Sequence, residues 1–384
     1  MIFDNIIGPQ RPVTWVLQFW PVVVASFVSS LTATALCKKI ALKFGIVDRP
    51  DDLVKTHKEP IAYLGGIGML IGLIAGILTG VVCLIDEEFF NPAMKWLLGI
   101  LAGGAIACFV GLTDDIFDIK PKQKIFGQVI AALILLLVGI VPNLRLITTP
   151  LSLPLPQSLE VVLEVLIVIF FVVGATNSLN LLDGLDGLCG GVTVIIVLAM
   201  LLLSAHLATW DFSTVGDPVR IIICLGLVGG VCGFLPFNRY PAKIFMGDAG
   251  SMLLGFMVAT LMILFAEKFP RWWMASIVAF GLPILDTAVA LVRRLINHRP
   301  LFVSDRGHIY DQMIDRGIPL KKSVAICYVL ASLYAVIGLA MSQIRTRYAA
   351  VVHVFVFVIS GLVIWKKGYL KMEGLRGAIR KESD

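Results

Sequence analysis

The chain has 384 residues, of which 58% are hydrophobic and only 15% are charged, and its formal net charge is +6. Its mean hydropathy is +0.92. A soluble domain averages about 45–50% apolar and about 25% charged residues. The composition excludes a soluble globule and is typical of a chain that is solvated by lipid.

Eleven apolar runs have the length of a membrane-spanning helix, because about 20 mostly apolar residues cross the hydrocarbon core. Backbone groups inside lipid must be hydrogen-bonded within their own segment, so each run is predicted to be a helix. We therefore predict an all-α polytopic membrane bundle with one domain over 1–384 and a basic, charged cytoplasmic tail over 367–384. The runs lie near 13–36, 63–85, 94–113, 125–142, 159–176, 188–209, 219–235, 251–266, 272–292, 322–343 and 349–365.

The Lys and Arg residues predict the orientation of these spans. Of the 32, 24 fall in connections on one side of the predicted bundle. Basic residues near span ends favour the cytoplasm, so this side is predicted to be cytoplasmic, with the N-terminus outside and the C-terminus inside. The outer connections, such as 86–92 and 142–156, are predicted to be plain linkers, whereas the inner ones are long and rich in Gly, Asp, Asn, Lys and His.

The first inner motif joins neighbouring carboxylates to lysines. Asp114, Asp115 and Asp118 precede lysines at positions 120, 122 and 124. Such carboxylates repel each other, and a cation relieves that repulsion. Mg²⁺ takes oxygen ligands and bridges to substrate phosphates, and lysines meet the remaining charge. The alternative is an ordinary solvated loop.

The second inner motif places four polar side chains at a spacing of three, Asn177, Asn180, Asp183 and Asp186. If the stretch stays helical, they fall along one face. Glycines at 184 and 187 permit turns or the close approach of a ligand. Polar groups in register at a membrane boundary are costly, which favours a functional role over a structural one.

The third inner motif is Phe-Met-Gly-Asp-Ala-Gly-Ser over 245–251, in which Asp248 opens the next apolar run. An acid and a hydroxyl at a helix start are typical of capping. The same place also suits a metal ligand beside backbone N–H groups that can face phosphate.

The fourth inner motif, over 306–311, contains Arg306, His308 and Tyr310 in the longest inner loop. A histidine beside arginines can contact phosphate or move a proton. Asp286 lies within the preceding apolar run, where a charge is costly, so we expect it to face the bundle interior. Support of the site and helix packing both remain open for Asp286.

Taken in order, these motifs resemble the polyprenyl-phosphate N-acetylhexosamine-1-phosphate transferase family. The resemblance runs from about residue 48 to about residue 317, and the order of the motifs makes it specific. It implies transfer of a sugar 1-phosphate from a UDP-sugar to polyprenyl (undecaprenyl) phosphate, with release of UMP, at the cytoplasmic face of the inner (plasma) membrane. It also implies a Mg²⁺ cofactor, for which Mn²⁺ is a substitute, and it is compatible with a homodimer. No nucleic-acid partner is expected.

The resemblance also implies roles for single residues. Asp248 and Asn180 would hold Mg²⁺, while Asp114 and Asp115 would lie at the lipid phosphate and His308 beside the diphosphate or sugar. The residues expected to bind substrate are Lys124, Asn177, Asp183, Asp186, Phe245 and Arg306.

One departure concerns the histidine loop. Bacterial relatives acting on small UDP-sugars usually carry His-Ile-His-His, whereas this chain has His308 followed by Ile309, Tyr310 and Asp311. The donor sugar therefore stays open, with the single-residue spacing favouring a simple UDP-N-acetylhexosamine.

Two other classes of protein are the alternatives, a Mg²⁺-dependent membrane prenyltransferase and a transporter. The motif at 245–251 is not expected in a prenyltransferase. A transporter would carry its ionisable groups at mid-span, whereas here they cluster at the ends of the spans.

Overall fold

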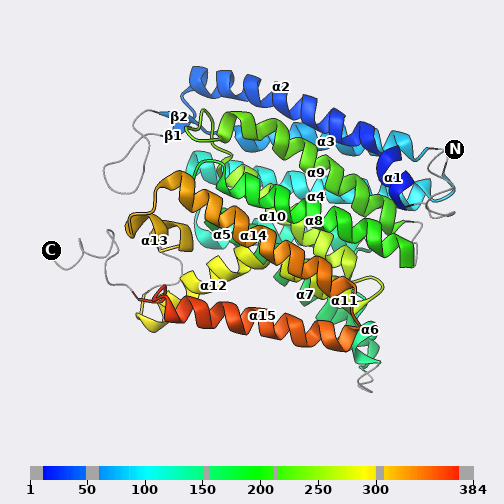
Figure 1. Cartoon of the computed structure of the whole chain (residues 1–384). Helices are drawn as coiled ribbons and strands as arrows, with labels where there is room; N and C mark the ends of the chain where they lie inside the picture. The colour runs from blue at the N-terminus through cyan, green and yellow to red at the C-terminus, as the bar shows by residue number, and fades with distance from the viewer. Residues whose placement is uncertain are drawn as a thin grey trace.

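The computed structural model describes residues 12–48, 60–85, 87–149, 155–210, 215–299 and 307–371, and most of them are helical. The helices form one bundle, with α1 and the pair β1–β2 at opposite ends (Figure 1). The helices are α1 Pro12–Gln18, α2 Trp20–Phe44, α3 Gly65–Cys83, α4 Phe90–Phe117, α5 Pro121–Val138, α6 Arg145–Thr148, α7 Gln157–Leu182, α8 Leu188–Trp210, α9 Gly216–Asn238, α10 Gly247–Phe265, α11 Pro270–Ala279, α12 Gly281–Ile296, α13 Ile309–Asp315, α14 Leu320–Ser342 and α15 Thr346–Lys366.

Ten of the described helices are long and apolar enough to cross a membrane, and the bent pair α11–α12 makes an eleventh if it counts as one span. This confirms the prediction of an all-α, multi-pass membrane bundle. The core is α10, along which every residue except Asp248 is buried, and α3, α4, α7, α9 and α11 pack around it. On the peripheral α15, only Ala349 and Ile364 are buried.

Small residues bring α2 against α9. The Ser26 hydroxyl donates to the Gly226 carbonyl and the Ser30 hydroxyl to the Gly230 carbonyl, both at 2.6 Å and both across 200 residues of sequence. In lipid, where apolar contact alone does not drive helices together, such close packing and interhelical hydrogen bonds stabilise the pair.

Two predicted spans are interrupted. The run near 13–36 divides at Phe19 into α1 and α2, because Pro21 in the first turn of α2 starts a new helix. The run near 272–292 bends by 65° between α11 and α12. Pro283, near the start of α12, offers no N–H and its ring crowds the carbonyl four residues earlier, so a straight helix is disfavoured.

Short elements outside the spans complete the fold. The outer connection at 142–156 is more than a plain linker, since it contains α6, where Arg145 pairs with Glu160 at 2.9 Å. At the other end, β1 (Val47–Asp48) and β2 (Ile61–Ala62) pair antiparallel. The Ala62 carbonyl then accepts from the Phe245 N–H at 2.8 Å, which ties this hairpin to the segment before α10.

Candidate active site

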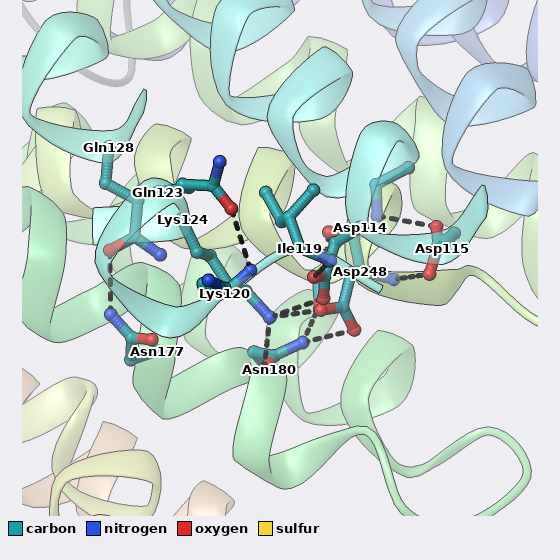
Figure 2. A network of polar contacts seen from close by, with 12 residues as sticks. Asp114, Asp115, Ile119, Lys120, Gln123, Lys124, Gln128, Asn177, Asn180 and Asp248 are labelled. Atoms are coloured by element: carbon teal, nitrogen blue, oxygen red, sulfur yellow. Dashed lines mark hydrogen bonds and ion pairs between the residues drawn. The ribbon is translucent and has the colours of Figure 1, made fainter. Parts of the chain in front are cut away.

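Four helix ends meet at the β1–β2 end of the bundle and bring together the first three inner motifs (Figure 2). Asp114 lies in the last turn of α4, Lys124 in the first turn of α5, Asn180 near the end of α7 and Asp248 in the first turn of α10. These residues are far apart in sequence, and the packing of α10 against α4 and α7 makes them neighbours.

The Lys124 ammonium lies among the oxygens of this cluster. It is 3.1 Å from Asp114 Oδ2 and 3.2 Å from Asn180 Oδ1, and it pairs with Asp248 Oδ2. The amide of Asn180 in turn donates to Asp248 Oδ1 at 2.7 Å and to the Ser251 hydroxyl at 3.1 Å. Three oxygens from three helices thus converge on one cation.

This donor set suits Mg²⁺. Carboxylate and amide oxygens are hard ligands, and the position of the ammonium group shows that they can surround a positive charge. Within the described ranges, no group of three or more His, Cys, Asp or Glu side chains is arranged to hold a metal alone. Mg²⁺ needs no such cage, since it keeps waters and takes substrate phosphates as further ligands.

Asp115 faces the start of α10. Its two carboxylate oxygens accept from the backbone N–H groups of Asp248, at 2.8 Å, and Ala249, at 3.1 Å. Gly247 makes this approach possible, because its φ is +67° and a Cβ there would lie 2.4 Å from Asp115 Oδ2. Asp115 therefore caps α10 from another helix and fixes the position of Asp248.

A cavity of ≈ 470 Å³ opens beside these carboxylates. Tyr63 forms part of its wall, and burial, with the charges of Asp48 and Asp115, raises the pKa of the Tyr63 phenol above its usual range. The hydroxyl therefore stays protonated and can donate a hydrogen bond. The lining residues are Gly45, Ile46, Val47, Asp48, Tyr63, Asp114, Asp115, Ile116, Asp118 and Asp248.

The helix of the second motif ends at Leu182, so its four polar residues do not share one helical face. Asp183 caps the end of α7, and Asp186 lies in the turn at 183–187, where its Oδ2 accepts from the Ala242 N–H at 2.8 Å. Burial, with the charges of Asp248 and Asp115, raises the pKa of Asp183 well above its usual range.

Asn177 lies apart from the carboxylate cluster. Its amide donates to Gln128 Oε1 at 2.8 Å and to the Val173 carbonyl at 2.7 Å, between α5 and α7 (Figure 2). Phe245 precedes α10 and packs edge-on against Tyr63, with ring centroids 6.0 Å apart. Its predicted part in binding the base stays a prediction.

The histidine loop is anchored to α12. His308 Nδ1 lies 2.7 Å from Asp286 Oδ2, and Asp286 Oδ1 accepts from the Ile309 N–H at 2.7 Å. Both His308 and Asp286 are buried, and Asp286 faces the interior as expected. Arg306 lies outside the described residues.

Three residues that contact the cluster or line the cavity were not among the predicted site residues. Ser251 bonds to Asn180, and Asp48 and Tyr63 line the cavity. Ser251 carried a usable signal, because it lies one turn after Asp248 on the same helix. Tyr63 is brought in only by the β1–β2 hairpin, and no local pattern marks it.

Comparison with known proteins agrees with the motifs. Residues 97–266 match the model of glycosyl transferase family 4. A probable undecaprenyl-phosphate N-acetylglucosaminyl 1-phosphate transferase of Bacillus subtilis is 28% identical, over 92% of each chain. A decaprenyl-phosphate N-acetylglucosaminephosphotransferase of Mycolicibacterium smegmatis is 29% identical over 79% of this chain and 77% of its own. An undecaprenyl-phosphate alpha-N-acetylglucosaminyl 1-phosphate transferase of Salmonella typhimurium is 28% identical over 82% of each. These similarities confirm the predicted family resemblance.

Proposed function

Because the chain resembles polyprenyl-phosphate N-acetylhexosamine-1-phosphate transferases along most of its length, we propose that it catalyses the same class of reaction. It transfers a sugar 1-phosphate, N-acetylhexosamine 1-phosphate, from a UDP-sugar to polyprenyl phosphate. An oxygen of the acceptor phosphate becomes bonded to the sugar-linked phosphorus, the bond from that phosphorus to the bridging oxygen breaks, and UMP leaves.

The observation that carries this proposal is the convergence of Asp114, Asn180 and Asp248 on the Lys124 ammonium. Phosphoryl transfer depends on charge neutralisation and positioning more than on covalent chemistry by the protein. Asp248 and Asn180 would hold Mg²⁺, which neutralises phosphate charge when it is bound. Lys124 would then turn from the carboxylates to the diphosphate.

The place of the cluster suits a lipid substrate. It lies at the ends of spanning helices, where the phosphate of a membrane lipid and a water-soluble nucleotide sugar can meet. Asp114 and Asp115 line the cavity there, and Asp115 also holds α10 in place. The distribution of Lys and Arg supports a cytoplasmic face of the plasma membrane, from which a nucleotide sugar would be supplied.

The test is UMP release by purified protein in detergent with undecaprenyl phosphate and Mg²⁺. The donors compared are UDP-GlcNAc, UDP-GalNAc and UDP-MurNAc-pentapeptide. Asp248→Asn and Asp115→Asn are expected to abolish release, whereas Glu164→Gln, remote from the cluster on α7, is expected to leave it unchanged. A parallel assay supplies a prenyl diphosphate and an aromatic acceptor, and diphosphate release there, with no UMP from the nucleotide sugars, would indicate a prenyltransferase. No product from any donor, with folded protein, would reject the proposal.

A further inference from the structure

Two tyrosines hold the two ends of the 183–187 turn. The Tyr310 hydroxyl, on α13, donates to the Leu181 carbonyl just before the turn at 2.8 Å. The Tyr328 hydroxyl, on α14, donates to the Gly187 carbonyl at 2.7 Å. The turn, which carries Asp183 and Asp186, is thus braced from outside by two equivalent neutral hydrogen bonds.

Tyr310 differs from Tyr328 in what its ring contacts. The rings of Tyr310 and His308 are stacked nearly parallel, at 8°, with centroids 5.5 Å apart. Both side chains are buried. The contact between His308 Nδ1 and Asp286 Oδ2 fixes one edge of the imidazole but leaves the ring free to rotate about that contact. The stacked Tyr310 ring restricts this rotation. Together they define the plane of the His308 ring.

The phenol also fits closely over the turn. A Cβ added at Gly184 would lie 2.2 Å from the Tyr310 hydroxyl oxygen, so the glycine leaves room for that oxygen to reach Leu181. One side chain therefore touches the histidine loop through its ring and the second motif through its hydroxyl. This contact involves the position at which the loop departs from His-Ile-His-His.

We propose that Tyr310 is a positioning residue that couples the His308 imidazole to the 183–187 turn. The inference rests on the proposed function and on the roles that the family resemblance implies, in which Asp183 and Asp186 of the turn bind the substrate and His308 lies beside the diphosphate or sugar. Tyr310 then keeps the 183–187 turn and the His308 imidazole, which would contact different parts of the nucleotide sugar, at a constant separation. It does not itself touch the reacting atoms.

The experiment compares Tyr310→Phe with Tyr328→Phe. Each variant loses one hydroxyl donor to the same turn, but only the first changes a residue that contacts His308. Hydrogen–deuterium exchange is measured on the purified protein without substrate. Tyr310→Phe is expected to raise exchange in peptides over both 181–187 and 307–311. Tyr328→Phe is expected to raise exchange near 187–191 only.

Kinetics of UMP release give the second measurement. One neutral hydrogen bond corresponds to about 0.5–1.5 kcal/mol, so Tyr310→Phe is expected to lower kcat/KM for the nucleotide sugar about 2- to 13-fold. In Tyr310→Phe, the KM for the lipid acceptor is expected to stay within about twofold of the wild-type value. In Tyr328→Phe, kcat/KM for the nucleotide sugar is expected to stay within about twofold of the wild-type value. In a His308→Asn background the stacked imidazole is gone. There Tyr310→Phe is expected to lower kcat/KM for the nucleotide sugar by less than about twofold, since the effects of coupled residues are not additive.

Equal kinetic losses in the two tyrosine variants would overturn the proposal, because they would report the stability of the turn alone. Unchanged exchange over 307–311 in Tyr310→Phe would overturn it as well. If the wild-type protein releases no UMP from any donor, the proposed function fails. The exchange measurement still decides whether Tyr310 couples the two segments.

Discussion

At the scale of single residues, the Lys124 ammonium occupies the oxygens that the proposed Mg²⁺ would use. The ammonium group contacts Asp114, Asn180 and Asp248, and only 14% of the side chain is exposed. A cation that binds there must displace it. The lysine neutralises the cluster in this structure, and under the proposed function it would become available to phosphate when Mg²⁺ binds.

Lys124→Met is expected to enlarge the stabilisation by Mg²⁺, because no ammonium group then competes for Asp114 and Asp248. Binding to the folded state alone stabilises by mass action, so the change in Tm between EDTA and saturating MgCl₂ measures it. UMP release is expected to fall at least about 100-fold, as when a charge-stabilising donor is removed. The control is Lys122→Met, an exposed lysine of the same helix turn. A smaller Mg²⁺ effect than in wild type would contradict the competition.

Asp183 predicts a pH dependence of stability. Its pKa is raised when folded, chiefly by burial and then by Asp248 and Asp115. The folded state therefore binds this proton more tightly than the unfolded state, and stability falls as pH rises above the ordinary Asp pKa of about 3.9. In EDTA, Asp183→Asn is expected to match the wild-type Tm near about pH 4 and to exceed it near about pH 8. Parallel Tm curves for the two proteins would contradict the assignment.

At the scale of elements, a buried amide pair sets α5 against α7. Gln128 is fully buried, its Oε1 accepts from Asn177, and its Nε2 has no hydrogen-bond partner among the described residues. Lys124 lies one turn before Gln128 on α5, and Asn180 lies about one turn after Asn177 on α7. The amide pair therefore holds the register at which Lys124 and Asn180 meet.

A double-mutant cycle tests the pair. Gln128→Leu and Asn177→Leu are each expected to destabilise the protein, and the double variant less than their sum, because no unpaired partner remains. The coupling is expected to be about 0.6 kcal/mol, the mean for hydrogen bonds within membranes, measured by reversible unfolding in mixed micelles. If Asn177 also binds substrate, Asn177→Leu will raise KM for the nucleotide sugar while Gln128→Leu will not. Strict additivity would contradict the coupling.

Local patterns predicted the membrane-spanning elements well, and they failed where tertiary contacts decide. The runs of apolar residues gave the spans because lipid leaves helix as the only solution. Asp248 and Asn180, which the structure brings together, stood out in their motifs, and their role as metal ligands stays a prediction. Asn177 shares the three-residue spacing of Asn180, yet it turns to Gln128, and nothing in the spacing separates the two. The bend between α11 and α12 was not predicted, although Pro283 carried a usable signal.

At the scale of the whole molecule, the end of the described chain closes over the histidine loop. Gln312 Nε2 donates at 2.9 Å to the carbonyls of both Gly307 and Tyr369. Arg316 donates to the Lys367 carbonyl at 3.0 Å and lies 4.2 Å above the Tyr369 ring. Residues 367–371 therefore pack on α13. The basic, charged cytoplasmic tail over 367–384 stays a prediction, and residues 372–384 lie outside the described residues.

Variants of this segment are expected to distinguish its contribution from that of residues 372–384. Tyr369→Leu removes the ring beneath Arg316 and is expected to cost about 0.5–1 kcal/mol, seen as a lower Tm, with a few-fold loss of UMP release. Truncation after Lys371 keeps every one of these contacts and is expected to leave both quantities unchanged. A truncated protein as unstable as Tyr369→Leu would place the stabilising contacts in the tail.

The bonds from Ser26 and Ser30 to α9 have a consequence for biosynthesis. Each serine is separated from its acceptor by 200 residues, so at about 5–20 residues per second the acceptor is synthesised roughly 10–40 s later. During that interval α2 can pair with its neighbour α3, and the hydroxyls can bond to carbonyls of their own helix, as Thr32 does to Val28 at 2.9 Å. The first long helix, α2, can therefore remain in the bilayer with its hydroxyl groups hydrogen-bonded until α9 has been synthesised and packs against it.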